Sequence, residues 1–276
     1  MSDISIVTAF YDIGRGDWST DVVKNGGPLP HYLQRSVDKY IDHFTRLCSL
    51  ENEIIVYTSE DLAPRLQAIS PKLKVVVFDF FKVYEFMLDQ IGKIQSDSAF
   101  VKRINPYQVR NPEYWSKEYV GVTSKKAFFV ADAYERGLVT NEWAAWVDFG
   151  YCRDDEHIPV TKKWSYDFTP GKMHFFNYRD PDIQNALPQV YMAVLHNIVY
   201  MIGGVFVGQR DSWRKLDSHM LTALGVLMED RLVDDDQGLL LYSYFIEPNA
   251  YELHKMDTNA PLEEVRSILR KFNKYE

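Results

Sequence analysis

Asp148 stands at the end of an apolar run, where a charged side chain is unusual. The run AAWVDF, residues 144–149, is typical of a buried strand. A carboxylate there costs free energy unless it is paired or binds a cation, and Gly150 would let a ligand or another backbone segment approach closely. Asp148 is therefore a candidate ligand for a divalent cation, the alternative being an acid that caps a turn.

A second candidate is the acidic run LVDDDQG, residues 232–238, at the start of an expected helix. One acid would cap that helix, and its dipole would favour the others. Neighbouring carboxylates also repel each other, so one of them could act as a base or contact a hydroxyl group of a ligand. A solvated, capped helix start is the alternative. The residues concerned are Asp234, Asp235, Asp236 and Gln237.

Glycines interrupt the strand-like run MIGGVFVGQ, residues 201–209. Glycine weakens a strand unless something must come close to it. Gly203 and Gly204 are therefore candidates for contact with a bound ligand such as a sugar ring, and a β-bulge is the alternative. The spacing of these glycines does not match the G-x-G-x-x-G nucleotide-binding pattern.

The elements that must position these residues alternate between strand and helix. Strands are expected over 4–10, 53–59 and 73–80, and helices over 31–50, 59–69 and 83–94. This order predicts an α/β fold, with a Rossmann-like, mostly parallel sheet flanked by helices. Ligands of such sheets bind at the carboxyl ends of the strands. The residues expected at that edge are Thr8, Ala9, Phe10, Tyr11 and Thr58.

Three cationic or titratable residues could serve a ligand at the same edge. Arg15 and Lys125 are expected close to it and could pair with a pyrophosphate, although a single lysine on a helix more often faces solvent. His254, in YELHKM, could ligate a metal. The alternative for His254 is a structural histidine.

The rest of the chain is less regular. A long helix is expected from near Tyr114, and the later elements are strands over 172–178, 201–207 and 249–254 and helices over 187–200, 212–230, 233–248 and 259–272. No internal repeat or linker separates them. We expect a single domain over 1–276, with halves at 1–150 and 151–276.

Bulk properties limit the function. The 276 residues carry a net charge of −8, which argues against a protein that mainly binds nucleic acid. The two cysteines, Cys48 and Cys152, do not form a disulfide or zinc pattern. No apolar run approaches the roughly 20 residues of a membrane-spanning helix, and the N-terminal segment does not look like a signal peptide. A cytoplasmic location is expected.

Four segments together resemble the bacterial HtrL/YibB-like family: IVTAFYDIGR (6–15), YWSKEYVGVTSKKAFFVADA (114–133), WVDFGY (146–151) and GGVFVG…DDDQG (203–238). The resemblance covers nearly the whole chain. These proteins are associated with gene clusters for lipopolysaccharide and surface polysaccharide, and the family looks like the GT-A class of glycosyltransferases. The resemblance therefore implies a GT-A-like fold, with a nucleotide-sugar-binding half (1–150) and a smaller acceptor-binding half (151–276).

The resemblance also implies roles for the candidate residues. Asp148 matches the first acid of the metal-binding D-x-D motif, whose second acid is replaced by Gly150. A Mn²⁺ or Mg²⁺ ion would then be held by Asp148 with His254 or an acid of the 234–236 run. Asp236, followed by Asp235, would lie nearest the acceptor hydroxyl as catalytic residue. The strand end Thr8–Tyr11, Arg15, Thr58 and Lys125 would hold the nucleotide sugar, and Gly203, Gly204 and Gln237 the sugar or acceptor.

The implied reaction moves a hexose from a nucleotide-diphosphate sugar, with a UDP-sugar favoured, to a hydroxyl of a lipopolysaccharide, O-antigen or capsule glycan. The acceptor could be lipid-linked, and the basic, partly apolar segment RSILRKFNK (266–274) could touch the inner face of the cytoplasmic membrane. The alternative for that segment is a packed terminal helix. Two other functions stay open, a non-catalytic glycan- or nucleotide-binding protein on the same fold and a metal-dependent hydrolase.

Overall fold

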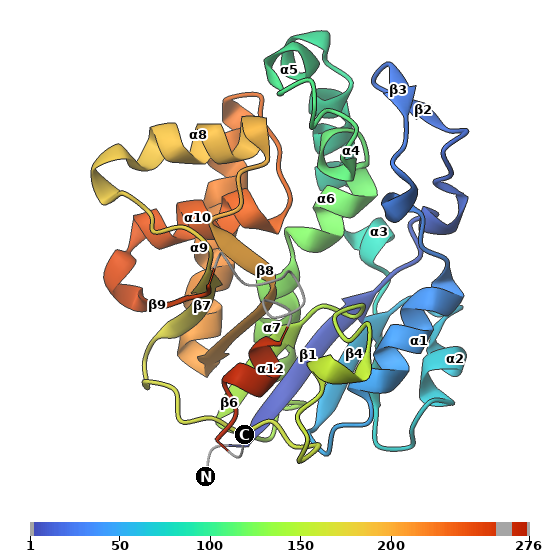
Figure 1. Cartoon of the computed structure of the whole chain (residues 1–276), viewed down its shortest axis with the longest axis vertical. Coiled ribbons are helices and arrows are strands. Elements are labelled where there is room, and N and C mark those ends of the chain that lie inside the picture. The colour runs from blue at the N-terminus through green and yellow to red at the C-terminus, as the bar shows by residue number, and fades with distance from the viewer. Residues whose placement is uncertain (1–2, 258–266, 275–276) are drawn as a thin grey trace.

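A seven-stranded sheet forms the centre of the computed structural model, which describes residues 3–257 and 267–274 (Figure 1). Its strand order is β5-β4-β1-β6-β8-β7-β9. Only β8 runs against its neighbours among these strands. The predicted α/β fold with a mostly parallel sheet is therefore confirmed. The strands are β1 (Ile4–Phe10), β4 (Ile54–Thr58), β5 (Lys74–Val77), β6 (Trp143–Val147), β7 (Met173–Asn177), β8 (Met201–Gln209) and β9 (Tyr251–Lys255).

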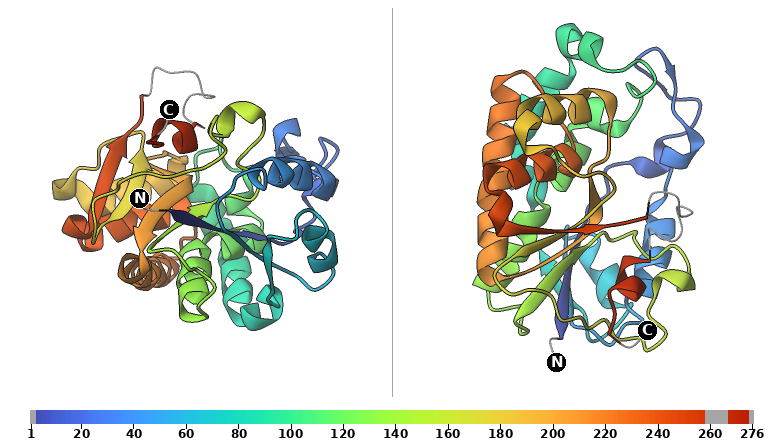
Figure 2. Two further views of the ribbon diagram at one scale, coloured as in Figure 1. Left: turned by 90° about the horizontal axis from the view of Figure 1, so that it is seen from below. Right: turned by 60° about the vertical axis from the view of Figure 1, so that its left-hand side comes forward.

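Helices cover both faces of this sheet, as Figure 2 shows. Residues of β1 alternate between two cores, with Val7 and Ala9 facing one and Ile4 and Ile6 the other. The first core is covered mainly by α4 (Glu85–Gln95), α6 (Lys117–Thr123), α7 (Lys126–Glu135), α8 (Ala186–His196), α9 (Arg210–Glu229) and α10 (Asp236–Ile246). The second is covered by α1 (Val37–Leu47), α2 (Ala63–Gln67) and α12 (Ile268–Lys271).

Short elements complete the described chain. They include the hairpin β2 (Val23–Lys24) and β3 (Gly27–Pro28), and the helices α3 (Phe80–Val83) and α5 (Ser98–Arg103). Single turns of 3₁₀ helix are formed by Arg15–Asp17, His31–Leu33, Pro112–Tyr114, Asp155–His157, Ile183–Asn185 and Pro248–Ala250. No helix in the described ranges is both long and apolar enough to span a bilayer.

Several element boundaries differ from the sequence predictions for local reasons. The helix expected over 31–50 begins at Val37, because the hydroxyl of Ser36 accepts a hydrogen bond from the Lys39 amide and caps it. The long helix expected from Tyr114 is divided into α6 and α7 at Ser124 and Lys125. Most of the helix expected over 259–272 lies outside the described residues, and only α12 falls within them.

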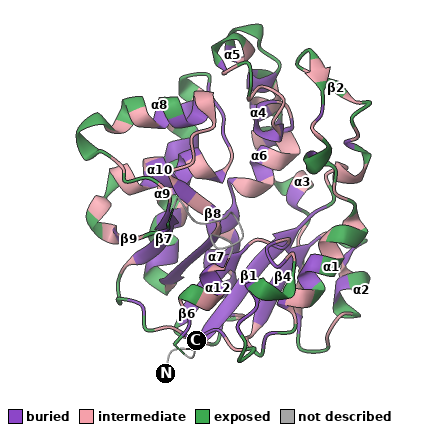
Figure 3. Ribbon diagram, in the orientation of Figure 1, coloured by how far each residue is buried: buried purple, intermediate pink, exposed green. Residues whose placement is uncertain are grey.

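The two predicted halves share one sheet. Strand β6, which ends the first half, pairs along its whole length with β8 of the second half, from Trp143 opposite Gln209 to Val147 opposite Val205. The purple strands in Figure 3 show that the middle of the sheet is buried, whereas the edge strands β5 and β9 are mostly half-buried. Residues from both halves are therefore brought to the same edge of the sheet.

Candidate functional site

A cavity of about 610 Å³ lies where β1 and β6 end and where β8 and α10 begin. It is at the carboxyl edge of the parallel strands, where ligands of such sheets bind. Many of the predicted site residues line this cavity together. They are Ala9, Phe10, Tyr11, Arg15, Asp148, Gly203, Gly204, Asp235, Asp236 and Gln237.

A buried lysine joins two of the acids in this cavity. The Nζ atom of Lys126 lies 2.8 Å from Oδ1 of Asp148 and 2.9 Å from Oδ2 of Asp236, and it donates a hydrogen bond to the Gly203 carbonyl at 2.8 Å. Its side chain is only 6% exposed. Burial by itself would lower the pKa of Lys126, but the carboxylates of Asp148 and Asp236 outweigh burial and raise that pKa. The ammonium group therefore stays charged.

Asp148 is held at the cavity wall by its neighbours in the sheet. Its backbone amide donates to the Gly204 carbonyl at 2.8 Å, and its Oδ1 accepts a hydrogen bond from the Trp146 indole at 2.7 Å. The side chain is 41% exposed, whereas that of Asp236 is buried. The Asp148 carboxylate is thus paired on one side and open to the cavity on the other.

Four acids gather around the start of α10. Burial, followed by the charge of Asp236, raises the pKa of Asp235 to about 7. Burial, followed by the charge of Asp235, raises the pKa values of Glu113 and Asp234 well above their usual range. Asp235 also caps α10, since its Oδ1 accepts a hydrogen bond from the Gln237 amide at 3.0 Å. Helix capping and a raised pKa therefore coexist in one side chain.

The glycines of β8 have different neighbours. A Cβ atom at Gly203 would overlap Oδ2 of Asp236 and lie 2.6 Å from its Cγ, so this position has no room for a side chain. A Cβ atom at Gly204 would lie 3.5 Å from the Tyr151 ring, which is an ordinary contact. Gly203 is thus required by the packing of α10 on the sheet, and its predicted contact with a sugar stays a prediction.

Three arginines line the cavity. Arg15 donates to the Tyr40 hydroxyl at 2.7 Å and to the Leu33 carbonyl, and its guanidinium lies 5.9 Å from the centre of the Tyr119 ring. Arg35 and Arg153 also line the cavity. Guanidinium groups in this arrangement can bind phosphate oxygens.

Four predicted residues are not among those that line this cavity. Thr8 and Thr58 are fully buried in the sheet, and the Thr58 hydroxyl donates to the Phe10 carbonyl at 2.8 Å. Lys125 is buried against another surface, with its Nζ 4.9 Å from the centre of the Tyr84 ring, and burial lowers its pKa. His254 contacts His174 on β7 instead.

Asp148 and His254 are therefore not brought together as a metal pair, because β9 places His254 elsewhere in the sheet. The alternative partner from the 234–236 run, Asp236, does lie near Asp148, but the Lys126 ammonium group contacts both carboxylates. Within residues 3–257 and 267–274, the one group of three His, Cys, Asp or Glu side chains with ligand atoms inside 4.8 Å of one another does not include Asp148. Asp148 by itself fits a cation that takes its other ligands from phosphate and water, as Mg²⁺ often does.

Sequence reasoning missed Lys126, Glu113 and Tyr119, all of which line the cavity. The sequence does contain a sign that Lys126 is buried. Residues 126, 130 and 133 share one helix face, and Val130 and Ala133 on that face are apolar. Glu113 precedes the helices in a proline-rich loop, so no periodic pattern marks it.

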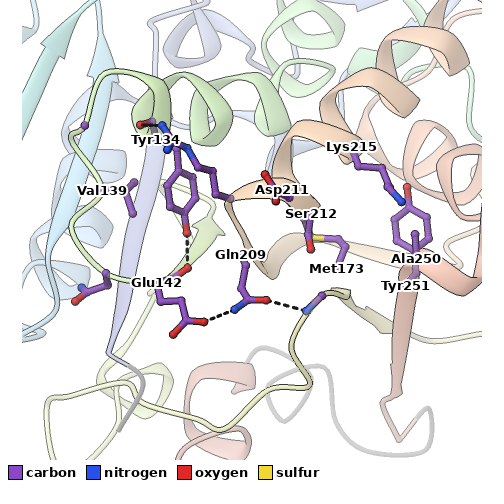
Figure 4. Close-up of a pocket in the computed structure, with 14 residues that line it drawn as sticks. Tyr134, Val139, Glu142, Met173, Gln209, Asp211, Ser212, Lys215, Ala250 and Tyr251 are labelled. Carbon is purple, nitrogen blue, oxygen red and sulfur yellow. Dashed lines mark hydrogen bonds between the residues drawn. The ribbon is translucent and has the colours of Figure 1, made fainter.

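A second cavity, of about 620 Å³, lies at the opposite end of β6 (Figure 4). Three of its polar side chains take part in hydrogen bonds within the lining: Tyr134 donates to the Glu142 backbone carbonyl at 2.9 Å, and Gln209 bridges the Glu142 carboxylate and the Gly171 amide. It contains none of the predicted site residues. We therefore take the first cavity as the candidate site.

Residues 2–260 match the family described as a bacterial protein of unknown function (HtrL_YibB). The chain belongs to this family, as its motifs indicated. It is 40% identical over 255 residues to protein HtrL of Escherichia coli strain K12, a match that covers 92% of this chain and 88% of that protein.

Two solved structures show a weaker likeness. Mouse xyloside xylosyltransferase 1 in its apo form has a TM-score of 0.40 and 13% identity, covering 93% of this chain and 86% of its own. Mannose-1-phosphate geranyltransferase from Thermus thermophilus has a TM-score of 0.35 and 12% identity, covering 93% and 74%. Neither TM-score is high enough for the likeness to bear on fold or function.

Proposed function

We propose that this protein is a GT-A-like glycosyltransferase that moves a hexose from a nucleotide-diphosphate sugar, with a UDP-sugar favoured, to a hydroxyl of a bacterial surface glycan. The observation that carries the proposal is the buried Lys126 paired with Asp148 and Asp236 in a cavity that also contains arginines. A site of this kind offers fixed positive charge for a departing diphosphate and carboxylates for an attacking hydroxyl.

The leaving diphosphate would be bound by Arg15, with help from Arg35 and Arg153, which line the same cavity. The bond between the sugar C1 atom and the diphosphate oxygen breaks, and the acceptor oxygen bonds to C1. The negative charge that collects on the diphosphate is then stabilised by groups already in place. A Mn²⁺ or Mg²⁺ ion held by Asp148 would add positive charge at the same phosphate oxygens.

An inverting transfer also needs a base for the acceptor proton. Asp235 suits this role better than Asp236, because Asp236 is paired with Lys126 whereas Asp235 is partly exposed with a pKa of about 7. Asp235 would take the proton as the acceptor oxygen attacks. A retaining transfer would not require this step.

The acceptor and the location belong to the same proposal. A lipid-linked glycan would be met at the inner face of the cytoplasmic membrane, where the exposed Lys271 of α12 would lie near anionic lipid. Ile268 and Leu269 of α12 are fully buried, so in this helix any contact with anionic lipid would rest on charge rather than on these apolar side chains. Flotation with anionic vesicles tests that contact.

The first test is a thermal-shift series of nucleotide diphosphates and nucleotide sugars, each with and without Mn²⁺. A ligand that binds only the folded protein raises its melting temperature. A shift with one nucleotide would identify the donor base, and its dependence on Mn²⁺ would test the cation at Asp148. No shift with any nucleotide would contradict the proposal.

The second test is transfer activity once a donor is known. We expect Asp148→Asn to lower turnover by at least about 100-fold, since the cation that Asp148 would hold at the leaving diphosphate is lost. Glu229→Gln, an exposed acid on α9 outside the cavity, is the matched control. Full activity of the Asp148 variant would contradict its role, and tight donor binding without turnover would favour a binding protein instead.

A further inference from the structure

A cluster of two histidines and one glutamate lies on the outer strands of the sheet. Strand β9 is at the edge of the order, and it pairs in parallel with β7 so that His174 is opposite Glu252 and Phe176 opposite His254. Because side chains alternate along a strand, Glu252 and His254 point to the same face. That face is the one where α12 packs, since Phe176 belongs to the same core as Ile268.

The potential ligand atoms of these residues converge. Nδ1 of His174 lies 2.9 Å from Nε2 of His254. The Glu252 carboxylate places Oε2 4.0 Å from His174 Nδ1 and Oε1 3.9 Å from His254 Nε2. We propose that His174, Glu252 and His254 form a binding site for a zinc-type divalent metal that fastens the edge strand β9 to β7.

The ligand set suits such a metal. Two imidazole nitrogens and one carboxylate are a known combination for Zn²⁺, which leaves a fourth position for water. With Zn–N bonds of about 2.0 to 2.1 Å, neighbouring ligand atoms of a tetrahedral site lie about 3.3 Å apart. The two nitrogens are 2.9 Å apart, and each has its nearest Glu252 oxygen, Oε2 for His174 and Oε1 for His254, at 4.0 and 3.9 Å. The Glu252 side chain would have to move toward the histidines so that one oxygen approaches both nitrogens.

The surroundings of His174 fix its orientation as a metal ligand requires. Its Nε2 lies 2.9 Å from the Thr169 carbonyl, which can only accept, so Nε2 carries the proton. The lone pair is then on Nδ1, the atom that faces His254 and Glu252. A backbone carbonyl on the outer nitrogen is the usual second partner of a metal-bound histidine.

The cluster is enclosed on one side and open on the other. His174 is fully buried, and the His254 ring packs against Phe168, Phe176 and Phe272. The Glu252 side chain is 38% exposed and that of His254 15%, so an ion could enter from the sheet edge marked by β9 in Figure 1. None of the three ligands lines the cavity of the candidate transferase site.

In the absence of an ion the two histidines are joined by a hydrogen bond. Since His174 Nδ1 accepts, His254 Nε2 donates. On metal binding, the proton on His254 Nε2 would move to Nδ1 of the same neutral imidazole, and the metal would bind at Nε2. The site therefore does not depend on the proposed transfer reaction, and it can be tested without a donor or an acceptor.

The test is metal titration of the full chain after treatment with a chelator. We expect one Zn²⁺ per chain by calorimetry, a rise in melting temperature on adding Zn²⁺, and visible absorption of a tetrahedral Co²⁺ complex when Co²⁺ is used as the probe. Glu252→Gln and His254→Gln should each abolish the thermal shift or weaken binding at least 10-fold.

Two control variants make the result specific. Asp148→Asn tests the transferase cavity, and His219→Ala removes another histidine that lies near a glutamate, with Nε2 3.9 Å from Glu247. Both should bind one Zn²⁺ as the wild type does. Loss of binding in either control, or unchanged binding in both ligand variants, would overturn the site.

If a ligand variant does not fold, the titration of the wild-type protein still tests the proposal. A wild-type protein that takes up no Zn²⁺ at micromolar concentration would also overturn the site.

Discussion

Lys126 pairs with two carboxylates that come from different elements, Asp148 after β6 and Asp236 at the start of α10. Removing one member of a buried ion pair is costly because the remaining charge keeps its desolvation penalty. We therefore expect Lys126→Met to lower the free energy of unfolding by about 3–5 kcal/mol in urea denaturation at pH 7.

The adjacent Lys125 is the matched control. It is buried as well, but its ammonium group lies over the Tyr84 ring and has no such pair of carboxylates. Lys125→Met should cost no more than about 2 kcal/mol, the upper range for a desolvated cation–π contact. Equal losses of stability in the two variants would show that the contribution of Lys126 to stability does not come from its pairing with Asp148 and Asp236.

Asp235 predicts a stability effect that depends on pH. Its pKa in the folded protein is about 7, against 3.8 for the free side chain, because of burial and the charge of Asp236. The folded state therefore holds the proton more tightly, and the contribution of Asp235 to stability falls as the pH rises from about 4 to about 7. Asp235→Asn removes that effect and keeps a good helix cap.

We thus expect Asp235→Asn to unfold at a higher temperature than the wild type at pH 8 and at the same temperature at pH 4. Melting curves across that pH range provide the measurement. If the melting temperatures of the variant and the wild type differed equally at both pH values, the charge of Asp235 would not be the cause of the difference.

How far the sequence predicts the site is clearest at the two lysines. The run SKKAFF predicts two neighbouring lysines in a helix. In the structure both lysines are buried, and they contact different residues. A helix turns by about 100° per residue, as its 3.6-residue period requires. The phase of α7 therefore decides which ammonium meets Asp148, and that phase depends on the break at Ser124 and Lys125, which the sequence pattern did not reveal.

Strand β8 and helix α10 illustrate the same problem at the level of elements. Their existence is predictable from apolar patterns, and both are confirmed. Their mutual contact is not, because it joins the carboxylate of Asp236 to the backbone at Gly203, two positions 33 residues apart. Glycine in a strand reports that something approaches closely, without saying whether it is a ligand or the protein itself.

A pair of alanine variants separates the two glycines. Gly203→Ala should destabilise the protein by more than about 2 kcal/mol, because its methyl group would overlap the Asp236 carboxylate and displace α10. Gly204→Ala should change stability by less than about 1 kcal/mol, since its methyl group meets only ordinary contacts. Denaturant midpoints measure both, and the reverse order would contradict this account of the packing.

At the scale of the whole molecule, α12 reaches back to the loop that carries the candidate site. Ile268 is fully buried, and its amide donates to the Tyr151 hydroxyl at 3.0 Å. The amide of Tyr151 in turn donates to the Asp148 carbonyl at 2.9 Å. Residues from the last part of the chain therefore help to hold the turn after β6.

This arrangement predicts that Ile268→Ala lowers stability by about 2–5 kcal/mol, the usual range for emptying a fully buried aliphatic site. Leu221→Ala, at an exposed position on α9, should change stability by less than about 0.5 kcal/mol. Urea unfolding of both variants is the measurement. If Ile268→Ala left the free energy of unfolding unchanged, α12 would contact the core without stabilising the protein.

The hydrogen bond between Ile268 and Tyr151 also has a consequence for synthesis of the protein on the ribosome. The four strands β1, β4, β5 and β6 are complete once residue 147 has been made, but Tyr151 in the turn after β6 meets Ile268 only when residue 268 has emerged. We expect nascent chains halted near residue 257 to be cut by protease at residues 148–153, and released chains to resist cutting there. Folding of these four strands and completion of the site would then be separate events in the life of each molecule.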